Sequence, residues 1–231
     1  MTDPENTPLR RTIRSFVRRT GRLTPGQQSA FKRLWPKYGL DFDSKDIDPS
    51  SLFGRTAPLL VEIGFGNGES LVEFASAHPD IDVIGIEVHS PGVGHCLLQA
   101  EKAGIENLRL VCHDAIEVLE HQIPDASLHR VNLYFPDPWP KARHHKRRIV
   151  QRDFLDLIAR KLRHGGTLNI ATDWENYAEH IDSVLADYPG FAMRQRREHG
   201  GDQPLDRAAT KFERRGLRLG HRIWDWEYVV I

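Results

Sequence analysis

The sequence is poor in cysteine and contains no long apolar stretch. Cys96 and Cys112 are its only cysteines, and they form no C-x-x-C pair. This argues against a disulfide framework and indicates two reduced core thiols in a cytoplasmic protein. No apolar run approaches the roughly 18 residues that a membrane span needs, and the N-terminal segment lacks the apolar part of a secretory signal. We therefore expect neither a membrane span nor a leader peptide.

Net charge is also absent, because 32 lysines and arginines balance 32 aspartates and glutamates. The charges are nevertheless segregated along the chain. Residues 10–22 hold six arginines and no acid, and residues 141–148 hold five lysines and arginines and no acid. Basic clusters of this kind on a neutral chain predict a localised surface for a polyanion.

Three regions are predicted along the chain. Residues 1–22 form a basic arm that we expect to be disordered. Residues 23–57 form a lead-in with one short helix, and residues 58–231 are long enough for one α/β domain.

The lead-in helix has a recognisable start. Thr24 is the expected N-cap, Pro25 takes the first helical position, and Gln27 completes a capping box. We expect Pro36 to end this helix and residues 37–57 to be irregular.

From residue 58 onward, apolar strands alternate with helices. The predicted strands are LLVEIGF, DVIGIEV, NLRLVCHD, RVNLYF and TLNIATD, and RIVQRDFLDLIARKLRHGG is a predicted amphipathic helix between the last two. FAMRQRR and HRIWDWEYVVI are predicted terminal strands. This alternation indicates a mostly parallel sheet with helices on both faces, which binds ligands at the carboxyl ends of its strands.

The first predicted strand ends in a glycine turn formed by Gly64, Gly66 and Gly68. Glycines allow the backbone to turn tightly and to approach a ligand closely. The helix that follows directs its N–H groups to the same place, which favours an anionic ligand group.

Acids occupy the ends of the first three predicted strands. Glu62 precedes the glycine turn, and Glu87 ends the second strand, where a carboxylate can accept hydrogen bonds from both hydroxyls of a ribose. Asp114 ends the third strand, where an acid can accept from an adenine amino group. Together with the glycine turn, these acids predict a nucleoside-type cofactor, either NAD or S-adenosylmethionine.

The fourth predicted strand ends in the stiff corner FPDPWP, which the cationic run KARHHKRR follows directly. Prolines restrict the backbone, so Asp137 is held in a fixed geometry, and Trp139 offers a flat face for stacking a base. The run can hold a phosphate backbone. Arg147 and Arg148 are predicted to enter a helix N-terminus, where cations are unfavourable, and this also indicates an anionic partner. No suitably spaced third ligand accompanies the histidines of the run, so no metal site is expected.

These motifs resemble those of the bacterial tRNA (guanine-N7-)-methyltransferases, which modify the variable-loop guanine at tRNA position 46. The resemblance covers most of the chain and rests on GRLTPGQQSAF, LWPKYGL, VEIGFGNGESL, LYFPDPWPKARHHKRRIVQRDFLDLIARKLRHGGTLNIATDWENYAEH and TKFERRGLRLGHRIWDWEY. It implies a class I S-adenosylmethionine-dependent methyltransferase domain over residues 58–231. Its α/β fold is Rossmann-like, with a seven-stranded, mostly parallel sheet that ends in an antiparallel hairpin.

The resemblance also implies site residues, with Asp137 as the catalytic residue. The cofactor-binding positions are Glu62, Glu87, Asp114 and Asp137, to which the turn adds Gly64, Gly66 and Gly68. The substrate-binding positions are Lys141, Asp173, Thr210, Lys211, Phe212 and Glu213. The RNA-binding run comprises Arg143, His144, His145, Lys146, Arg147 and Arg148. Ala142 stands where the family commonly has a second lysine, so one phosphate contact is expected to be missing.

The residues alone leave three other functions open. A dinucleotide-dependent oxidoreductase shares the glycine turn but does not explain the cationic run. A non-catalytic RNA-binding protein does not explain acids at successive strand ends. A methyltransferase for another RNA base, such as adenine N6, usually carries a [DN]-P-P-[YFW] corner, which PDPW resembles without matching. We expect tRNA as partner, no DNA, membrane or metal, and a monomer, because no self-complementary apolar surface can be recognised.

Overall fold

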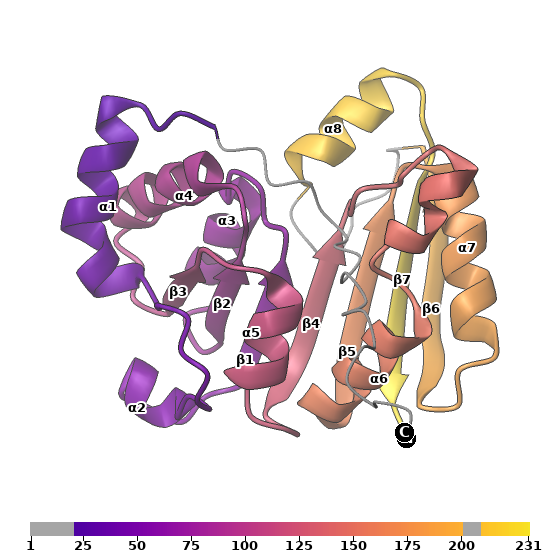
Figure 1. Cartoon of the computed structure of the whole chain (residues 1–231), viewed down its shortest axis with the longest axis horizontal. Helices are drawn as coiled ribbons and strands as arrows, with labels where there is room; N and C mark the ends of the chain where they lie inside the picture. The colour runs from indigo at the N-terminus through magenta and orange to yellow at the C-terminus, as the bar shows by residue number, and fades with distance from the viewer. Residues whose placement is uncertain (1–20, 201–208) are drawn as a thin grey trace, which may run out of the picture.

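The computed structural model of the protein describes residues 21–200 and 209–231, so the predicted basic arm lies almost entirely outside the described residues. One seven-stranded sheet, in the order β3-β2-β1-β4-β5-β7-β6, forms the centre of the molecule (Figure 1). Its strands are β1 (Leu59–Ile63), β2 (Asp82–Ile86), β3 (Leu108–Val111), β4 (Leu128–Tyr134), β5 (Leu162–Thr172), β6 (Phe191–His199) and β7 (Ile223–Val230). Strands β1 to β5 pair in parallel, and β7 pairs antiparallel with both β5 and β6. The predicted sheet and its antiparallel end are confirmed.

Helices cover both faces of this sheet. They are α1 (Pro25–Tyr38), α2 (Pro49–Phe53), α3 (Glu69–Ala77), α4 (Ser90–Ala103), α5 (Ala115–His121), the 3₁₀ helix η1 (Ala142–Arg147), α6 (Arg152–Lys161), α7 (Glu175–Ala186) and α8 (Lys211–Arg218). Side chains of α5, α6 and α7 form one core with the sheet, and those of α1, α3 and α4 form a second core on the other face. All five residues of β1 are buried, because this strand contacts both cores. Apart from the buried Glu62, its residues are apolar, as expected for a strand covered on both faces.

The lead-in confirms the predicted start of α1 and contradicts its predicted end. Thr24 and Gln27 form the expected capping box. Pro36, however, lies inside the helix, which continues to Tyr38. A proline removes only one backbone donor, and the buried Tyr38 fixes the last turn through a 3.0 Å hydrogen bond from its hydroxyl to the Ile105 carbonyl. The segment after α1 is not wholly irregular either, because it contains α2.

The helix after the cationic run is shorter than predicted. It begins at Arg152 and ends at Lys161, and the following Leu162 already pairs with Leu128 of β4. Lys161 is buried because its ammonium group donates to the Ile123 carbonyl at 2.7 Å and to Asp125 at 2.6 Å. The stretch LRHGG therefore belongs to β5, where Gly165 has a φ of 74° at a shift in the pairing register with β4.

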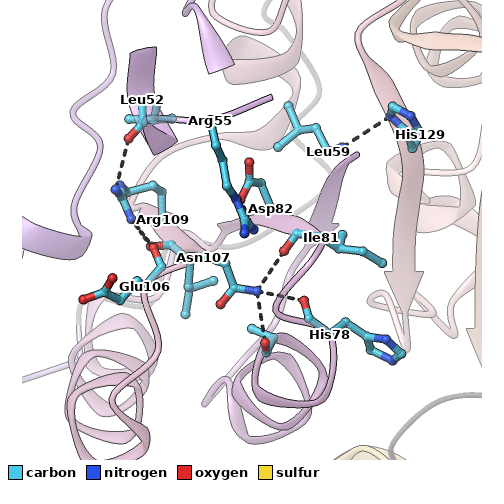
Figure 2. A network of polar contacts seen from close by, with 12 residues as sticks. Leu52, Arg55, Leu59, His78, Ile81, Asp82, Glu106, Asn107, Arg109 and His129 are labelled. Carbon is cyan, nitrogen blue, oxygen red and sulfur yellow. Dashed lines mark hydrogen bonds and ion pairs between the residues drawn. The ribbon is translucent and has the colours of Figure 1, made fainter. Parts of the chain in front are cut away.

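A polar network lies at the amino ends of the central strands, on the opposite side of the sheet from their carboxyl ends (Figure 2). The side-chain amide of Asn107 lies within 2.8–3.0 Å of three backbone carbonyls, which belong to Ala75, His78 and Ile81. Arg55 pairs with the buried Asp82 at 2.6 Å. These contacts hold the end of α3 against β2 and β3, so this edge is structural.

Across residues 21–200 and 209–231, no helix combines the length and the apolar character needed to cross a membrane.

Candidate active site

A cavity of about 800 Å³ opens at the carboxyl ends of β1 to β4. Its walls come from the turn after β1, the ends of β2 and β3, the corner after β4, and one side of α8. Ten of the predicted site residues line it: Glu62, Gly64, Gly66, Gly68, Glu87, Asp114, Asp137, Thr210, Lys211 and Phe212. The glycine turn and the proline-rich corner, which are distant in sequence, therefore face one space.

The glycine turn has a backbone that other residues adopt only with strain. Gly64, Gly66 and Gly68 have φ values of 72°, 62° and 77°. A Cβ atom on Gly68 would lie 2.3 Å from Sγ of Cys96, so the turn packs directly on α4. A Cβ on Gly64 would meet nothing within 4 Å, because this residue borders the open space of the cavity.

Glu87 has a preset orientation at the end of β2. One carboxylate oxygen accepts from the Gly66 amide at 2.9 Å, and the other accepts from the Val88 and His89 amides at 2.7 and 2.9 Å. The carboxylate thus ties the glycine turn to β2. Carboxylate oxygens have further lone pairs, so Glu87 can still accept hydrogen bonds from a ligand in the cavity.

The other two strand-end acids also have defined places. Asp114 caps α5 by accepting from the Ile116 amide at 3.0 Å. Glu62 is 4% exposed and lies close to Cys96. Burial, and then the negative charge of Glu62, raise the pKa of the Cys96 thiol, so this cysteine stays protonated and inert.

The corner after β4 holds Asp137 between two residues of unusual backbone conformation. Phe135 and Trp139 have φ values of 52° and 47°, in the left-handed region that non-glycine residues rarely occupy. Such a residue costs on the order of 1–3 kcal/mol and persists only where its surroundings fix it. The corner therefore needs support from the rest of the fold.

Arg148 provides part of that support, and here the structure corrects the sequence interpretation. Its side chain is only 2% exposed and donates to the Pro138 carbonyl at 3.0 Å. It also donates to the carbonyl and the side-chain oxygen of Asn176 at 3.2 and 2.8 Å, and its guanidinium lies 4.9 Å from the Tyr177 ring centre. Burial lowers the pKa of this guanidinium from its usual value. Arg148 ties the corner to α7, and its donors are directed into the protein rather than toward RNA.

The remaining cationic run forms η1 rather than the start of an α-helix. Arg147 is the last residue of η1 and Arg148 follows it, so neither lies at a helix N-terminus. The prediction that these two arginines incur an electrostatic cost at a helix N-terminus is therefore wrong. They lie at the C-terminal end of η1, where positive charge is favourable. Lys141, Arg143 and Lys146 are exposed along this segment.

Trp139 is less open than the sequence suggested. The Arg147 guanidinium lies 3.9 Å from its ring centre, and His144 packs edge-on at 5.9 Å. One face of the indole thus carries a cation before any base arrives. Lost hydration, and then the neighbouring lysines and arginines, lower the pKa of His144, so its imidazole is neutral at pH 7.

The C-terminal positions that were predicted to bind substrate are mainly residues that build α8. Thr210 and Glu213 are both buried and form a reciprocal capping box at its start. Asp173 pairs with His221 at 3.1 Å, and a Cβ atom on Gly216 of α8 would lie 2.8 Å from the Asp173 carboxylate. Asp173, Glu213, Lys141 and the run 143–148 do not line the cavity. Lys211 and Phe212 are exposed at its edge.

Sequence reasoning missed other residues that line the cavity, notably His89, His113, Arg215 and Arg218. The signal for the two arginines was present in TKFERRGLR, because T-x-x-E is a capping-box pattern and predicts a helix there. In the part of the chain that the structure describes, no group of three or more His, Cys, Asp or Glu side chains is placed to hold a metal ion.

The strand order, the glycine turn and the strand-end acids are those of class I methyltransferases, and solved structures agree with this class. The structure of an antibiotic-related methyltransferase matches with a TM-score of 0.57 and 15% identity, covering 81% of this chain and 98% of that chain. A 16S rRNA (adenine(1408)-N(1))-methyltransferase from Catenulisporales acidiphilia, with cosubstrate SAM, matches with a TM-score of 0.54 and 20% identity, covering 81% of this chain and 93% of that one. These likenesses show the fold.

Sequence comparisons identify the family. The model of a family described as "Putative methyltransferase" matches residues 56–226. The tRNA (guanine-N(7)-)-methyltransferase of Sodalis glossinidius is 56% identical over 223 residues, covering 96% of this chain and 93% of the relative. That of Vibrio cholerae is 53% identical over 225 residues, covering 97% and 94%. The chain belongs to the tRNA (guanine-N(7)-)-methyltransferase family.

Proposed function

We propose that this protein transfers a methyl group from S-adenosylmethionine to N7 of guanine 46 in the variable loop of tRNA, leaving S-adenosylhomocysteine. One observation carries the proposal: Asp137, held in a stiff corner, borders the same cavity as the glycine turn and Glu87. The names of the relatives support the substrate, because each is a tRNA (guanine-N(7)-)-methyltransferase. The proposal is for a cytoplasmic enzyme that acts as a monomer.

The size of the cavity and its hydrogen-bond acceptors suit S-adenosylmethionine. A volume of about 800 Å³ lies within the range of about 300–1,000 Å³ that is usual for small-molecule sites. Glu87, already oriented by three amides, would accept from the ribose hydroxyls, and Asp114 would accept from the adenine amino group. The glycine turn leaves room for the amino-acid part, because Gly64 borders open space. When bound, S-adenosylmethionine supplies an electrophilic methyl group on a sulfonium.

Methylation of guanine at N7 requires no proton transfer by the protein before the attack. N7 carries a lone pair and no proton, so no general base has to act before the attack. The residues instead have to align the base, and alignment of this kind lowers a barrier by about 7–11 kcal/mol in favourable cases. The restricted backbone around Asp137 suits that task.

Asp137 has two roles in this proposal. Its carboxylate accepts from the N1–H and amino edge of the guanine, which orients N7. Methylation makes the base cationic, and a carboxylate fixed in advance stabilises charge that develops in the transition state. Asp173 takes no direct part, because it lies against α8 and His221 instead of in the cavity.

RNA is held from the corner side by the exposed cations of η1. Lys141 directly precedes η1, Arg143 and Lys146 lie within it, and all three are exposed and would contact phosphates, while Arg147, the last residue of η1, lies on the Trp139 ring. The guanine has to leave its place in the folded tRNA to reach the cavity.

The activity is tested with unmodified tRNA transcript, S-adenosylmethionine and the full chain. Digestion to nucleosides and mass analysis should give 7-methylguanosine, and a transcript with adenine in place of guanine 46 should give none. A different methylated nucleoside, or none, would refute the proposed substrate or the proposed reaction.

Asp137 is tested by the near-isosteric Asp137→Asn substitution. We expect kcat to fall by about 100-fold or more, since the fixed charge is lost, while the Kd for tRNA changes less than about threefold. Single-turnover methylation and fluorescence anisotropy of labelled tRNA measure the two quantities. Turnover near that of the wild type would show that Asp137 has no catalytic role.

A further inference from the structure

The helix α8 forms the wall of the cavity that faces the corner and the glycine turn. Figure 1 shows it above the carboxyl ends of the central strands. Lys211, Phe212, Arg215 and Arg218 line the cavity from this side, whereas Trp139 and Pro140 line it from the corner side. The cationic run that follows Pro140 therefore starts at one wall, and α8 is the other.

α8 is fixed in place by contacts that do not use these side chains. Its capping box closes its first turn, and Arg214 pairs with Glu69 at the start of α3 at 2.8 Å. Gly216 allows the helix backbone to approach Asp173 so closely that a Cβ atom there would lie 2.8 Å from the carboxylate. The cations of α8 that line the cavity are thus not needed to hold the helix in place.

Among the residues that the structure describes, three cations of α8 have no acidic partner. Within residues 21–200 and 209–231, Lys211, Arg215 and Arg218 form no ion pair, in contrast to Arg214. All three are exposed. Lys211 and Arg215 lie at i and i+4, and Arg215 and Arg218 lie at i and i+3, so like charges are neighbours along one side of the helix. Like charges at such positions weaken a helix by a few tenths of a kcal/mol, and an anion bound between them removes that repulsion.

We propose that Arg215 and Arg218, next to the already predicted substrate-binding position Lys211, form a second RNA-binding surface that contacts the phosphodiester backbone on the opposite side of the target guanosine from η1. This rests on the proposed function and deepens it. A nucleotide that enters the cavity has one phosphate on each side of its sugar. Cations on both walls hold these two phosphates apart, and the base between them is directed toward Asp137 and the glycine turn.

The test is the double variant Arg215→Gln/Arg218→Gln, measured by anisotropy of labelled tRNA over a range of salt concentrations. We expect the Kd for tRNA to rise by about tenfold at 150 mM salt, and the slope of log K against log salt to fall by about 1–2, since each lost phosphate contact removes about 0.7–0.9. The Kd for S-adenosylmethionine, measured by calorimetry, should stay within about twofold.

The matched control is Arg194→Gln/Arg222→Gln, which also removes two exposed arginines. These pair with Glu227 and Glu198 and do not line the cavity. Their loss should leave the Kd for tRNA and the salt slope unchanged. Thermal unfolding of both double variants checks that each is folded.

Two results would overturn the inference. An unchanged tRNA affinity and slope in the Arg215→Gln/Arg218→Gln variant would show that α8 contacts no phosphate. A raised Kd for S-adenosylmethionine with normal tRNA binding would assign the arginines to the carboxylate of the cofactor. Both results are binding measurements and can be obtained even if the wild-type protein makes no 7-methylguanosine. Failure of this inference can therefore be distinguished from failure of the proposed function.

Discussion

Two adjacent arginines show how far single residues can differ within one motif. Arg147 lies on the ring of Trp139, next to the exposed cations of η1, whereas Arg148 is 2% exposed and bonded to Pro138 and Asn176. The sequence could not separate them, because both belong to an unbroken cationic run. Only the fold brings α7 against the second arginine and leaves the first at the surface. The charge of a residue was therefore predictable, and its partner was not.

At this scale we predict that Arg148→Met impairs catalysis more than RNA binding. The Pro138 carbonyl loses its donor, which costs about 1–3 kcal/mol where the group stays buried, and Asp137 loses its fixed position. We expect kcat to fall by about tenfold or more, while the Kd for tRNA and its salt slope change little. Single-turnover rates and anisotropy measure these effects.

The control for Arg148 is Arg143→Met, which removes an exposed cation from the same run. We expect it to raise the Kd for tRNA and to reduce the salt slope by about 1. If Arg148→Met reduced the slope equally, Arg148 would be an RNA contact after all. Asn176→Ala removes one partner of the guanidinium and should give a smaller loss of kcat in the same direction.

Whole elements were predicted best where a local signal marks them. The capping box of α1 and the left-handed Gly104 after α4 follow from residue type alone. The end of α6 at Lys161 does not, because the strand that follows is fixed by pairing with Leu128, a contact that no local pattern encodes. α8 has a local signal of its own in Thr210 and Glu213, which resemblance had assigned to substrate binding.

We therefore predict that Thr210 acts through its cap. Thr210→Val removes the hydroxyl that accepts from the Glu213 amide at 3.1 Å and should lower the free energy of unfolding by about 1 kcal/mol. It should also raise the Kd for tRNA, since α8 is then less well fixed. Thr210→Ser keeps the hydroxyl and should retain both values, as measured by denaturant unfolding and anisotropy. A serine variant as impaired as the valine variant would point to the threonine methyl group instead.

The molecule as a whole is neutral, yet its acids and its exposed cations are grouped around one cavity. The predicted parallel sheet and the carboxyl-end rule were sufficient to place the glycine turn and Asp137 at one cavity, because neighbouring parallel strands have their carboxyl ends on the same side of the sheet. The opposite wall could not be predicted in this way. It depends on a helix that returns from the far end of the chain and that only tertiary contacts, such as Arg214 with Glu69, place there.

At this scale we predict a steep salt dependence of tRNA binding despite the zero net charge. Six phosphate contacts, three from the corner side and three from α8, give a slope of about 4–5, so affinity should fall by roughly 250- to 1,000-fold between 50 and 200 mM salt. The Kd for S-adenosylmethionine, for which we propose the cavity as the site, should change by less than about threefold over the same range. Calorimetry and anisotropy at matched salt concentrations give both curves, and a slope below about 1 would contradict the phosphate contacts.

The position of α8 near the end of the chain has a consequence for synthesis on the ribosome. The glycine turn and Glu87 emerge early, yet the last wall of the cavity is not complete until residues 211–218 have left the exit tunnel. Every shorter product lacks one wall of the cavity and the phosphate contacts that we propose for α8. A product interrupted before residue 211 also lacks β7, the strand that joins β6 to the rest of the sheet.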